Sequence, residues 1–193
     1  MKRYILTGTP GSGKTAVLRQ LELDGFSVIE EAATDVIALW QAQGVAEPWR
    51  NVSFIDLIVD LQKKRQIRTA CEPGNVQFHD RSAICTAALA EYLGFPLTNP
   101  LTRELDRIRN ESIFEREVFF LRNLGFVAPT EARRISFEDA LRFERIHEET
   151  YRRFGFHIVW VETGSIDERA KMIKSAVNGC YLKGAFPQGT EAP

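Results

Sequence analysis

The chain has 193 residues, of which 44% are hydrophobic and 26% are charged, and its net charge is −1. A chain of this length and composition can bury a full hydrophobic core as one domain. Its near-neutral charge gives no overall attraction to nucleic acid or to an anionic membrane, so we expect neither as a partner. No apolar run is long enough for a membrane span, and the three cysteines are far apart, so we expect a cytoplasmic protein.

The chain begins with a strand, a glycine-rich turn and a helix. Residues 3–7 are β-branched and aromatic, which is typical of a strand, and residues 16–21 are typical of a helix. The turn between them matches the phosphate-binding pattern G-x-x-x-x-G-K-[ST] through Gly8, Thr9, Pro10, Gly11, Ser12, Gly13, Lys14 and Thr15. Backbone N–H groups and the helix N-terminus face phosphate in this pattern. The turn therefore predicts an ATP site, with Lys14 on the β- and γ-phosphates and the Thr15 hydroxyl on Mg²⁺.

Apolar strands and helices alternate along the rest of the chain. Further strands are expected at 26–29, 76–79, 118–121 and 156–161, and helices at 32–43, 53–70, 83–93, 99–113, 137–154 and from 165 onward. This alternation predicts an α/β fold with a five-stranded parallel sheet and right-handed crossovers. Ligands bind beyond the carboxyl ends of the strands in such sheets. Residues 1–180 are expected to form a single domain, followed by an irregular tail at 181–193.

Residues at several helix boundaries and in one irregular segment have expected roles. Asn99 is expected to cap a helix that Pro100 opens. The pairs Ser136/Asp139 and Ser165/Glu168 have the spacing of capping boxes. Residues 122–136 have no clear period and form a candidate lid. Within this segment, Arg133 and Arg134 are expected to bring positive charge over the phosphates, or else to serve only solubility.

Ionisable residues end the second and third strands. Asp80 suits Mg²⁺, because it ends a strand beside the glycine-rich turn, and its alternative role is a helix N-cap. Arg81 is expected to clamp a phosphate, or alternatively to form a surface ion pair. One of Glu30 and Glu31 is expected to accept a proton from an attacking hydroxyl, because adjacent residues on a strand point in opposite directions. Their alternative role is to favour a helix N-terminus as solvated acids.

Other conspicuous side chains are assigned to structure or left open. The basic run 63–65 with Arg68 is expected to be a solvated helix face. His79 and His147 are expected to be structural, and no Cys/His spacing resembles a zinc site. The aromatic side chains of Trp40, Trp49 and Phe54 are expected either in the core or beside an acceptor molecule.

The glycine-rich turn, the acid pair, Asp80-Arg81-Ser82 and Arg133-Arg134 together resemble the P-loop small-molecule kinases. The nearest branches are the deoxynucleoside and thymidylate kinases, the nicotinamide-riboside kinases and small bacterial AAA-type ATP-binding proteins. The resemblance implies a three-layer fold with sheet order 2-3-1-4-5, and it covers most of residues 1–175 in element order. The chain departs from the deoxynucleoside kinases by carrying Asp80 where they usually have Glu.

The activity that this resemblance implies is transfer of the ATP γ-phosphate to a hydroxyl or phosphate of a small nucleoside-like acceptor. The catalytic residues it implies are Lys14, Glu30, Glu31, Asp80, Arg81, Arg133 and Arg134. The alternative is a non-catalytic or slowly hydrolysing nucleotide-binding regulator with a protein or lipid partner. A regulatory GTPase is excluded, because the chain has neither D-x-x-G nor N-K-x-D.

Overall fold

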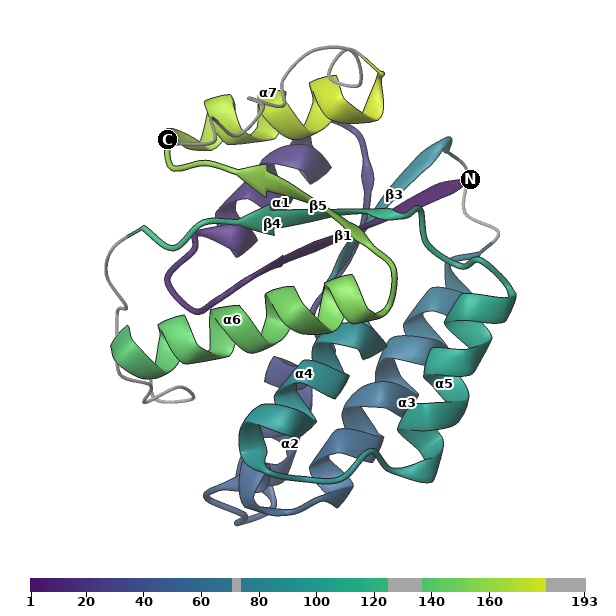
Figure 1. Cartoon of the computed structure of the whole chain (residues 1–193), viewed down its shortest axis with the longest axis vertical. Coiled ribbons are helices and arrows are strands. Elements are labelled where there is room, and N and C mark those ends of the chain that lie inside the picture. Colours follow the sequence, from purple (N-terminus) through teal and green to yellow (C-terminus); the bar gives the residue numbers. More distant parts are fainter. Residues whose placement is uncertain (71–73, 125–136, 180–193) are drawn as a thin grey trace, which may run out of the picture.

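The computed structural model describes residues 1–70, 74–124 and 137–179. These residues form a five-stranded parallel sheet in the order β2-β3-β1-β4-β5 (Figure 1). The strands are β1 (Lys2–Gly8), β2 (Ser27–Ile29), β3 (Val76–Asp80), β4 (Glu117–Leu121) and β5 (His157–Val161). The α/β class and the 2-3-1-4-5 order are both confirmed. This order places β1, which leads into the glycine-rich turn, at the centre of the sheet.

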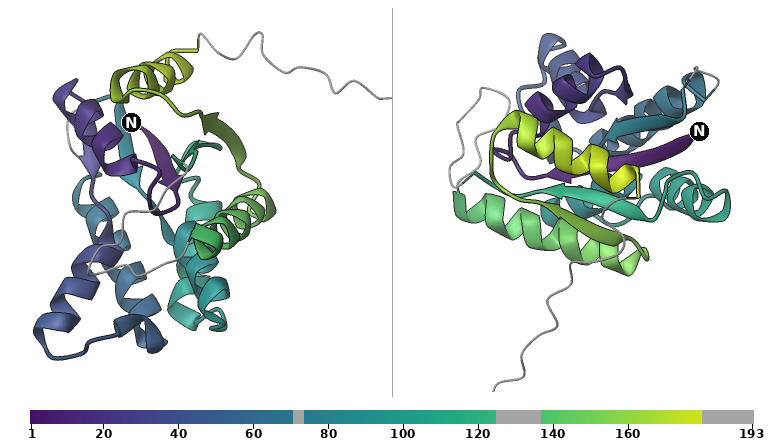
Figure 2. Two further views of the ribbon diagram at one scale, coloured as in Figure 1. Left: turned by 90° about the vertical axis from the view of Figure 1, so that its left-hand side faces the viewer. Right: turned by 90° about the horizontal axis from the view of Figure 1, so that it is seen from above.

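Helices cover the sheet on both sides, so the fold has three layers (Figures 1 and 2). On one side lie α1 (Lys14–Leu23) and α7 (Ile166–Val177), which pack against each other. On the other side lie α2 (Ala32–Ala42), the short 3₁₀ helix η1 (Pro48–Arg50), α3 (Ser53–Arg68), α4 (Ala83–Leu93), α5 (Asn99–Asn110) and α6 (Phe137–Arg153). None of the helices among the described residues is both long and apolar enough to cross a bilayer.

Alternation of side chains along β1 explains how one strand serves two cores. Tyr4 and Leu6 pack with buried residues of α1 and α7, including Val17 and Ile173. Ile5 points to the opposite side and packs with residues of α3, α4, α5 and α6. Successive side chains of a strand point to opposite faces, and both faces of this sheet are covered. The carboxyl end of β1 is therefore held between two packed layers.

The helix boundaries agree with the sequence at some ends and differ at others. The capping box of Ser165 and Glu168 is present at the start of α7. The expected cap at Asn99 is wrong, because the hydroxyl of Thr98 accepts from the backbone N–H of Leu101 at 3.3 Å. The helix also ends at Asn110 rather than near residue 113, because Ser112 adopts a left-handed backbone with φ of 48°. The expected box at Ser136 lies outside the described residues.

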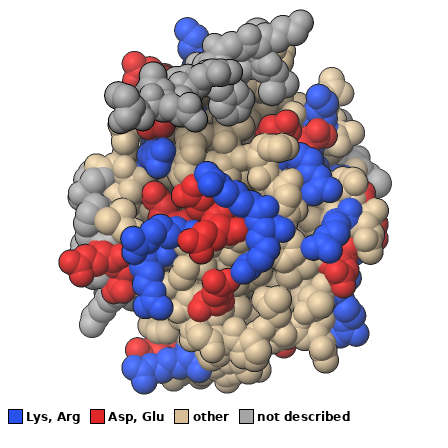
Figure 3. All heavy atoms as spheres, in the orientation of Figure 1, with Lys and Arg blue, Asp and Glu red and all other residues tan. Residues whose placement is uncertain are grey.

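Charged side chains of both signs lie close together on the face shown in Figure 3, with Asp and Glu near its centre flanked by Lys and Arg. Exposed ion pairs lie along and across α6. Arg152 contacts Glu148 at 2.7 Å, and Arg153 contacts Glu91 of α4 at 2.8 Å. These exposed pairs contribute little stability individually.

Candidate active site

The turn between β1 and α1 has the backbone of an anion-binding loop. Gly8 has φ of 153°, and a Cβ there would lie 2.8 Å from the carbonyl oxygen of Leu121. Gly13 is left-handed with φ of 71° and occupies the N-cap of α1, and it has no side chain that could accept a hydrogen bond from the helix. The first N–H groups of α1 therefore remain available to an anion, and the helix dipole favours one there.

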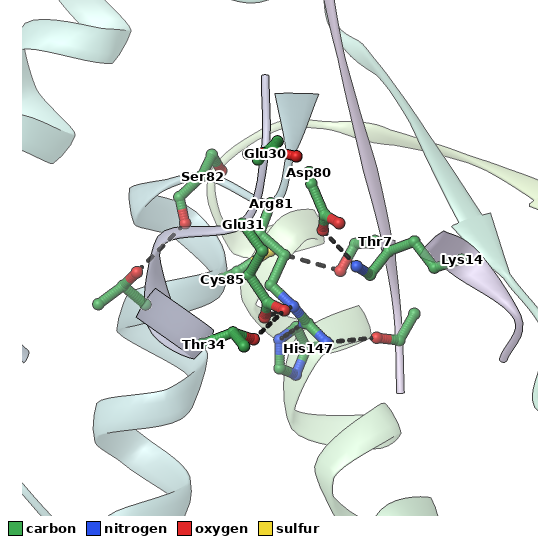
Figure 4. Close-up of polar contacts among 12 residues, drawn as sticks. Thr7, Lys14, Glu30, Glu31, Thr34, Asp80, Arg81, Ser82, Cys85 and His147 are labelled. Carbon is green, nitrogen blue, oxygen red and sulfur yellow. Dashed lines mark hydrogen bonds and ion pairs between the residues drawn. The ribbon is translucent and has the colours of Figure 1, made fainter. Parts of the chain in front are cut away.

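Lys14 and Asp80 form a buried ion pair between the start of α1 and the end of β3 (Figure 4). Their side chains are 6% and 7% exposed. Burial raises the pKa of the Asp80 carboxyl, and the charge of Lys14 opposes that rise. Asp80 does not cap the following helix, because Ser82 is the N-cap of α4 and accepts from the N–H of Ile84 at 3.3 Å. The capping alternative for Asp80 is therefore wrong.

Arg81 is buried and has a polar partner at each nitrogen of its guanidinium. Its Nε donates to Oε1 of Glu31 at 2.8 Å, and its Nη2 donates to the carbonyl oxygen of Gly8 at 2.8 Å. Its Nη1 lies 3.3 Å from Nε2 of His147. The backbone of Arg81 is left-handed with φ of 70°, which is a strained conformation for a residue with a side chain. The alternative of a surface ion pair is wrong, because this pair is buried against the glycine-rich turn.

His147 of α6 completes this chain of contacts as a neutral acceptor. Its Nδ1 lies 3.0 Å from the carbonyl oxygen of Phe143 and therefore carries the proton, which leaves the Nε2 lone pair to accept from Arg81. Burial, with the charge of Arg81, lowers the pKa of His147 to about 3. The expectation that His147 is structural overlooked this contact with a strand-end arginine.

Glu30 and Glu31 have different surroundings. The Glu30 carboxylate is 56% exposed and pairs with Arg19, whose hydrogen bond lowers the pKa of Glu30. The Glu31 carboxylate is 13% exposed, binds Arg81 and accepts a hydrogen bond from the Thr34 hydroxyl at 3.0 Å. The two side chains diverge, as expected for neighbours at a strand end.

Arg65 of α3 supports the segment that carries these two acids. Its Nη1 donates to the carbonyl oxygens of Glu30 and Glu31 at 3.1 and 2.8 Å, and its Nη2 pairs with Asp35. Arg65 is 16% exposed. The expectation that the basic run is only a solvated helix face is therefore wrong at this residue.

Two cavities adjoin the glycine-rich turn, and Glu31 lines both. The smaller, of about 210 Å³, is also lined by Thr15, Glu30 and Asp80. The larger, of about 700 Å³, is also lined by Pro10, Arg81, His147 and an apolar and aromatic set that includes Ile37, Trp49, Phe54, Leu89, Tyr92 and Phe143. A cavity of this size and lining suits a small organic molecule.

The sequence left open whether Trp40, Trp49 and Phe54 lie in the core or beside an acceptor molecule, and the structure does not give the same answer for all three. Trp49 and Phe54 line the larger cavity. Trp40 packs against Phe54, with a ring-centroid separation of 6.5 Å, and belongs to the same apolar cluster. Arg133 and Arg134 lie outside the described residues, as does most of the candidate lid at 122–136.

Two residues near the turn carried no recognisable sequence pattern. Asn123 donates from Nδ2 to the carbonyl oxygen of Pro10 at 3.1 Å, and Arg169 of α7 donates from Nη1 to the carbonyl oxygen of Ser12 at 2.7 Å. Both contacts hold backbone carbonyls of the turn from the side of β4 and α7. Neither could be found from spacing, because each joins residues more than a hundred positions apart.

The sheet order, the glycine-rich turn and the Lys14–Asp80 pair define a P-loop NTPase fold of the kinase-like type. The model of the AAA domain family matches residues 3–169, and the chain belongs to that family. Comparison with curated protein sequences gave no match.

Solved structures share the fold at low sequence identity. Deoxyadenosine kinase from M. mycoides with bound dATP is 14% identical with a TM-score of 0.60, and the match covers 91% of this chain and 99% of that one. The NadR protein in complex with NAD and AMP-PNP is 17% identical with a TM-score of 0.66, over 97% of this chain. The match spans only 52% of the NadR chain.

Proposed function

We propose that this protein is an ATP- and Mg²⁺-dependent kinase that phosphorylates a small nucleoside-like acceptor held in the larger cavity. The observation that carries the proposal is the position of Glu31, which lines both the acceptor-sized cavity and the cavity beside Thr15 and Asp80. A carboxylate that lines both cavities would reach a hydroxyl in one cavity that attacks a γ-phosphate in the other. A cytoplasmic location would supply both ATP and Mg²⁺.

The nucleotide end of the site uses the turn and the Lys14–Asp80 pair. The proposed phosphate-binding set is the eight-residue turn from Gly8 to Thr15, whose N–H groups and Lys14 would bind the phosphates. Thr15 and Asp80 line one cavity and offer oxygen atoms, the ligands that Mg²⁺ prefers, with phosphates and water supplying the rest. When bound, Mg²⁺ would neutralise charge on the phosphates. Phosphates would also give Lys14 a second anionic partner besides Asp80.

The acceptor end of the site centres on the Glu31–Arg81 pair. Glu31 would orient the acceptor hydroxyl and take its proton, while Arg81 would offset the negative charge that spreads over the transferred phosphoryl group. His147 and the carbonyl of Gly8 hold the Arg81 guanidinium toward the turn. Arg133 and Arg134 are proposed to approach the phosphates from the candidate lid.

The test begins by identifying the acceptor. The protein is incubated with Mg-ATP and a metabolite extract, and phosphorylated products are sought by mass spectrometry. With the acceptor known, Glu31→Gln is compared with Glu30→Gln, which makes the same chemical change one residue away at a side chain outside the larger cavity. Loss of a general base costs about 10²–10⁴-fold in rate. We expect this loss in kcat for Glu31→Gln alone, with ATP affinity unchanged.

Two results would favour the nucleotide-binding regulator over the kinase. The first is a broad acceptor screen that yields only slow ATP hydrolysis. The second is a Glu31→Gln variant that hydrolyses ATP at the rate of the parent protein.

A further inference from the structure

Arg169 is a buried arginine whose hydrogen-bond partners are uncharged. Its side chain is 4% exposed and lies at the start of α7. Its Nη1 donates to the carbonyl oxygen of Ser12 at 2.7 Å, and its Nη2 donates to the carbonyl oxygen of Arg122 at 3.4 Å. Its Nε is buried without a hydrogen-bond partner. Within residues 1–70, 74–124 and 137–179, no carboxylate forms an ion pair with it.

A buried guanidinium without a counter-ion is costly. Arginine is almost never fully buried unless it is paired, because removal of its charge from water costs several kcal/mol. Arg81, the other buried arginine at this turn, contacts Glu31 directly. Burial lowers the pKa of Arg169, as expected for a guanidinium that is removed from water. Two carbonyl dipoles offset only part of this cost.

The guanidinium is placed against the phosphate-binding turn. Its Nη1 lies 3.0 Å from where a Cβ of Gly13 would be, so a larger residue at position 13 would displace it. The carbonyl it binds belongs to the Ser12–Gly13 peptide, whose N–H is that of Gly13. A hydrogen bond to a peptide carbonyl strengthens the donor character of the N–H in the same peptide. Arg169 therefore acts on the turn in two ways: it brings a positive charge, and it polarises the N–H of Gly13.

We propose that Arg169 is a positioning residue of the phosphate site, and that the polyphosphate of the bound nucleotide is the counter-ion that no residue in the described part of the chain supplies. This proposal rests on the proposed function only in that a nucleotide binds at the turn. It requires no acceptor and no phosphoryl transfer. It predicts that Arg169 weakens the stability of the free protein while strengthening polyphosphate binding, whereas a purely structural residue would stabilise the free protein.

The test compares Arg169→Met with Lys171→Met, which removes the same charge from an exposed position two residues further along α7. Binding of inorganic tripolyphosphate and of adenosine is measured by calorimetry, and the unfolding temperature of the free protein is measured for each variant. We expect Arg169→Met to bind tripolyphosphate about tenfold more weakly or worse, which corresponds to about 1.4 kcal/mol. Adenosine affinity should not change in either variant, and the free Arg169→Met protein should unfold at the parent temperature or higher.

Opposite results would overturn the proposal. Equal tripolyphosphate affinity in Arg169→Met and the parent would do so, as would an equal loss in Lys171→Met. If Arg169→Met does not fold, the role is structural unless Arg169→Lys, which keeps the charge and loses the planar fork, retains tripolyphosphate affinity. If a kinase screen finds no acceptor, these binding results still stand. The kinase proposal and the Arg169 proposal can therefore be contradicted independently of each other.

Discussion

At the scale of single residues, the site is a set of buried charges that constrain one another. Lys14 is paired with Asp80, and Arg81 is paired with Glu31. Removing one member of a buried pair leaves the other as an uncompensated charge, so we expect substitutions of these residues to change the stability of the protein as well as nucleotide binding. Measuring both the stability of each variant and its affinity for nucleotide separates the two effects.

Lys14→Ala should bind ATP about ten- to a hundredfold more weakly, because a charge-assisted contact worth about 1.5–3 kcal/mol is lost. A nucleotide titration measures the change. Lys64→Ala, an exposed cation on α3 that lines neither cavity, is the control and should bind ATP like the parent. Unchanged affinity in Lys14→Ala would contradict the assignment of the turn.

Asp80→Asn tests the metal site. The amide keeps the shape of the side chain but loses the negative charge that would attract Mg²⁺. We expect ATP binding without metal to remain nearly intact while the dependence of binding on Mg²⁺ concentration weakens. If Mg²⁺ titrations of the variant and the parent coincide, Asp80 serves only as the partner of Lys14.

His147 should make the fold sensitive to acid. Its pKa is about 3 in the folded protein, lowered by burial and by Arg81, against an ordinary value of 6.5. Glu31 and the Phe143 carbonyl act in the opposite direction and are outweighed. The unfolded chain therefore binds the proton first, so stability is complete above about pH 6.5 and falls as the pH drops toward 3.

The expected slope from His147 is about 1.4 kcal/mol per pH unit over that range. Urea unfolding of the parent and of His147→Gln between pH 4 and 7 measures it. His79, also buried with a pKa of about 3, contributes a similar slope and remains in both proteins. In the His147→Gln variant, the slope of the free energy of unfolding against pH should be smaller by the contribution of one proton. An identical slope in the two proteins would show that His147 does not stay neutral when folded.

At the scale of elements, the ends of helices and strands bring the site together. α7 begins at a capping box and carries Arg169 in its first turn, directly against the turn between β1 and α1. The β2–α2 segment is held by Arg65 of α3, which fixes the direction of Glu31. Elements that are far apart in the sequence therefore determine how the site is positioned.

Ser165→Ala tests the start of α7. Loss of an N-cap hydroxyl costs about 0.5–2 kcal/mol, and Glu168 would also lose its bond to the same hydroxyl. Urea unfolding should show a loss of about 1 kcal/mol. Ser175→Ala in the same helix is the control and should be neutral or slightly stabilising, because alanine is the better helix former. A loss equal in both variants would argue against a specific cap.

At the scale of the whole molecule, ligand binding at the turn should stabilise every layer, because β1 packs on both sides and α1 packs on α7. Mg-ATP at a hundredfold its Kd should add about 2.7 kcal/mol. For a domain of this size, the unfolding temperature should rise by about 5–10 °C. A single calorimetric transition that moves as a unit is expected for one domain over residues 1–180. Two transitions, only one of which responds to Mg-ATP, would show that the chain unfolds as two domains and not as one.

Local patterns in the sequence determined the fold class, the position of the phosphate-binding turn and the strand ends that surround it. They could do so because strand alternation, glycine spacing and capping residues act over a few neighbouring positions. Asp80 and Glu31 could be named as candidates for the same reason, since Asp80 follows directly after the expected strand 76–79 and Glu31 lies two positions after the expected strand 26–29.

Only the tertiary structure decided which partners these residues have. Glu31 rather than Glu30 adjoins the larger cavity because of the direction of its side chain and the contacts of Arg81 and Arg65. The Arg81–His147 contact joins residues 66 apart, and the Arg169–Ser12 contact joins residues 157 apart. No local pattern encodes such pairs, because burial and electrostatic partnership depend on which elements the packed layers bring together.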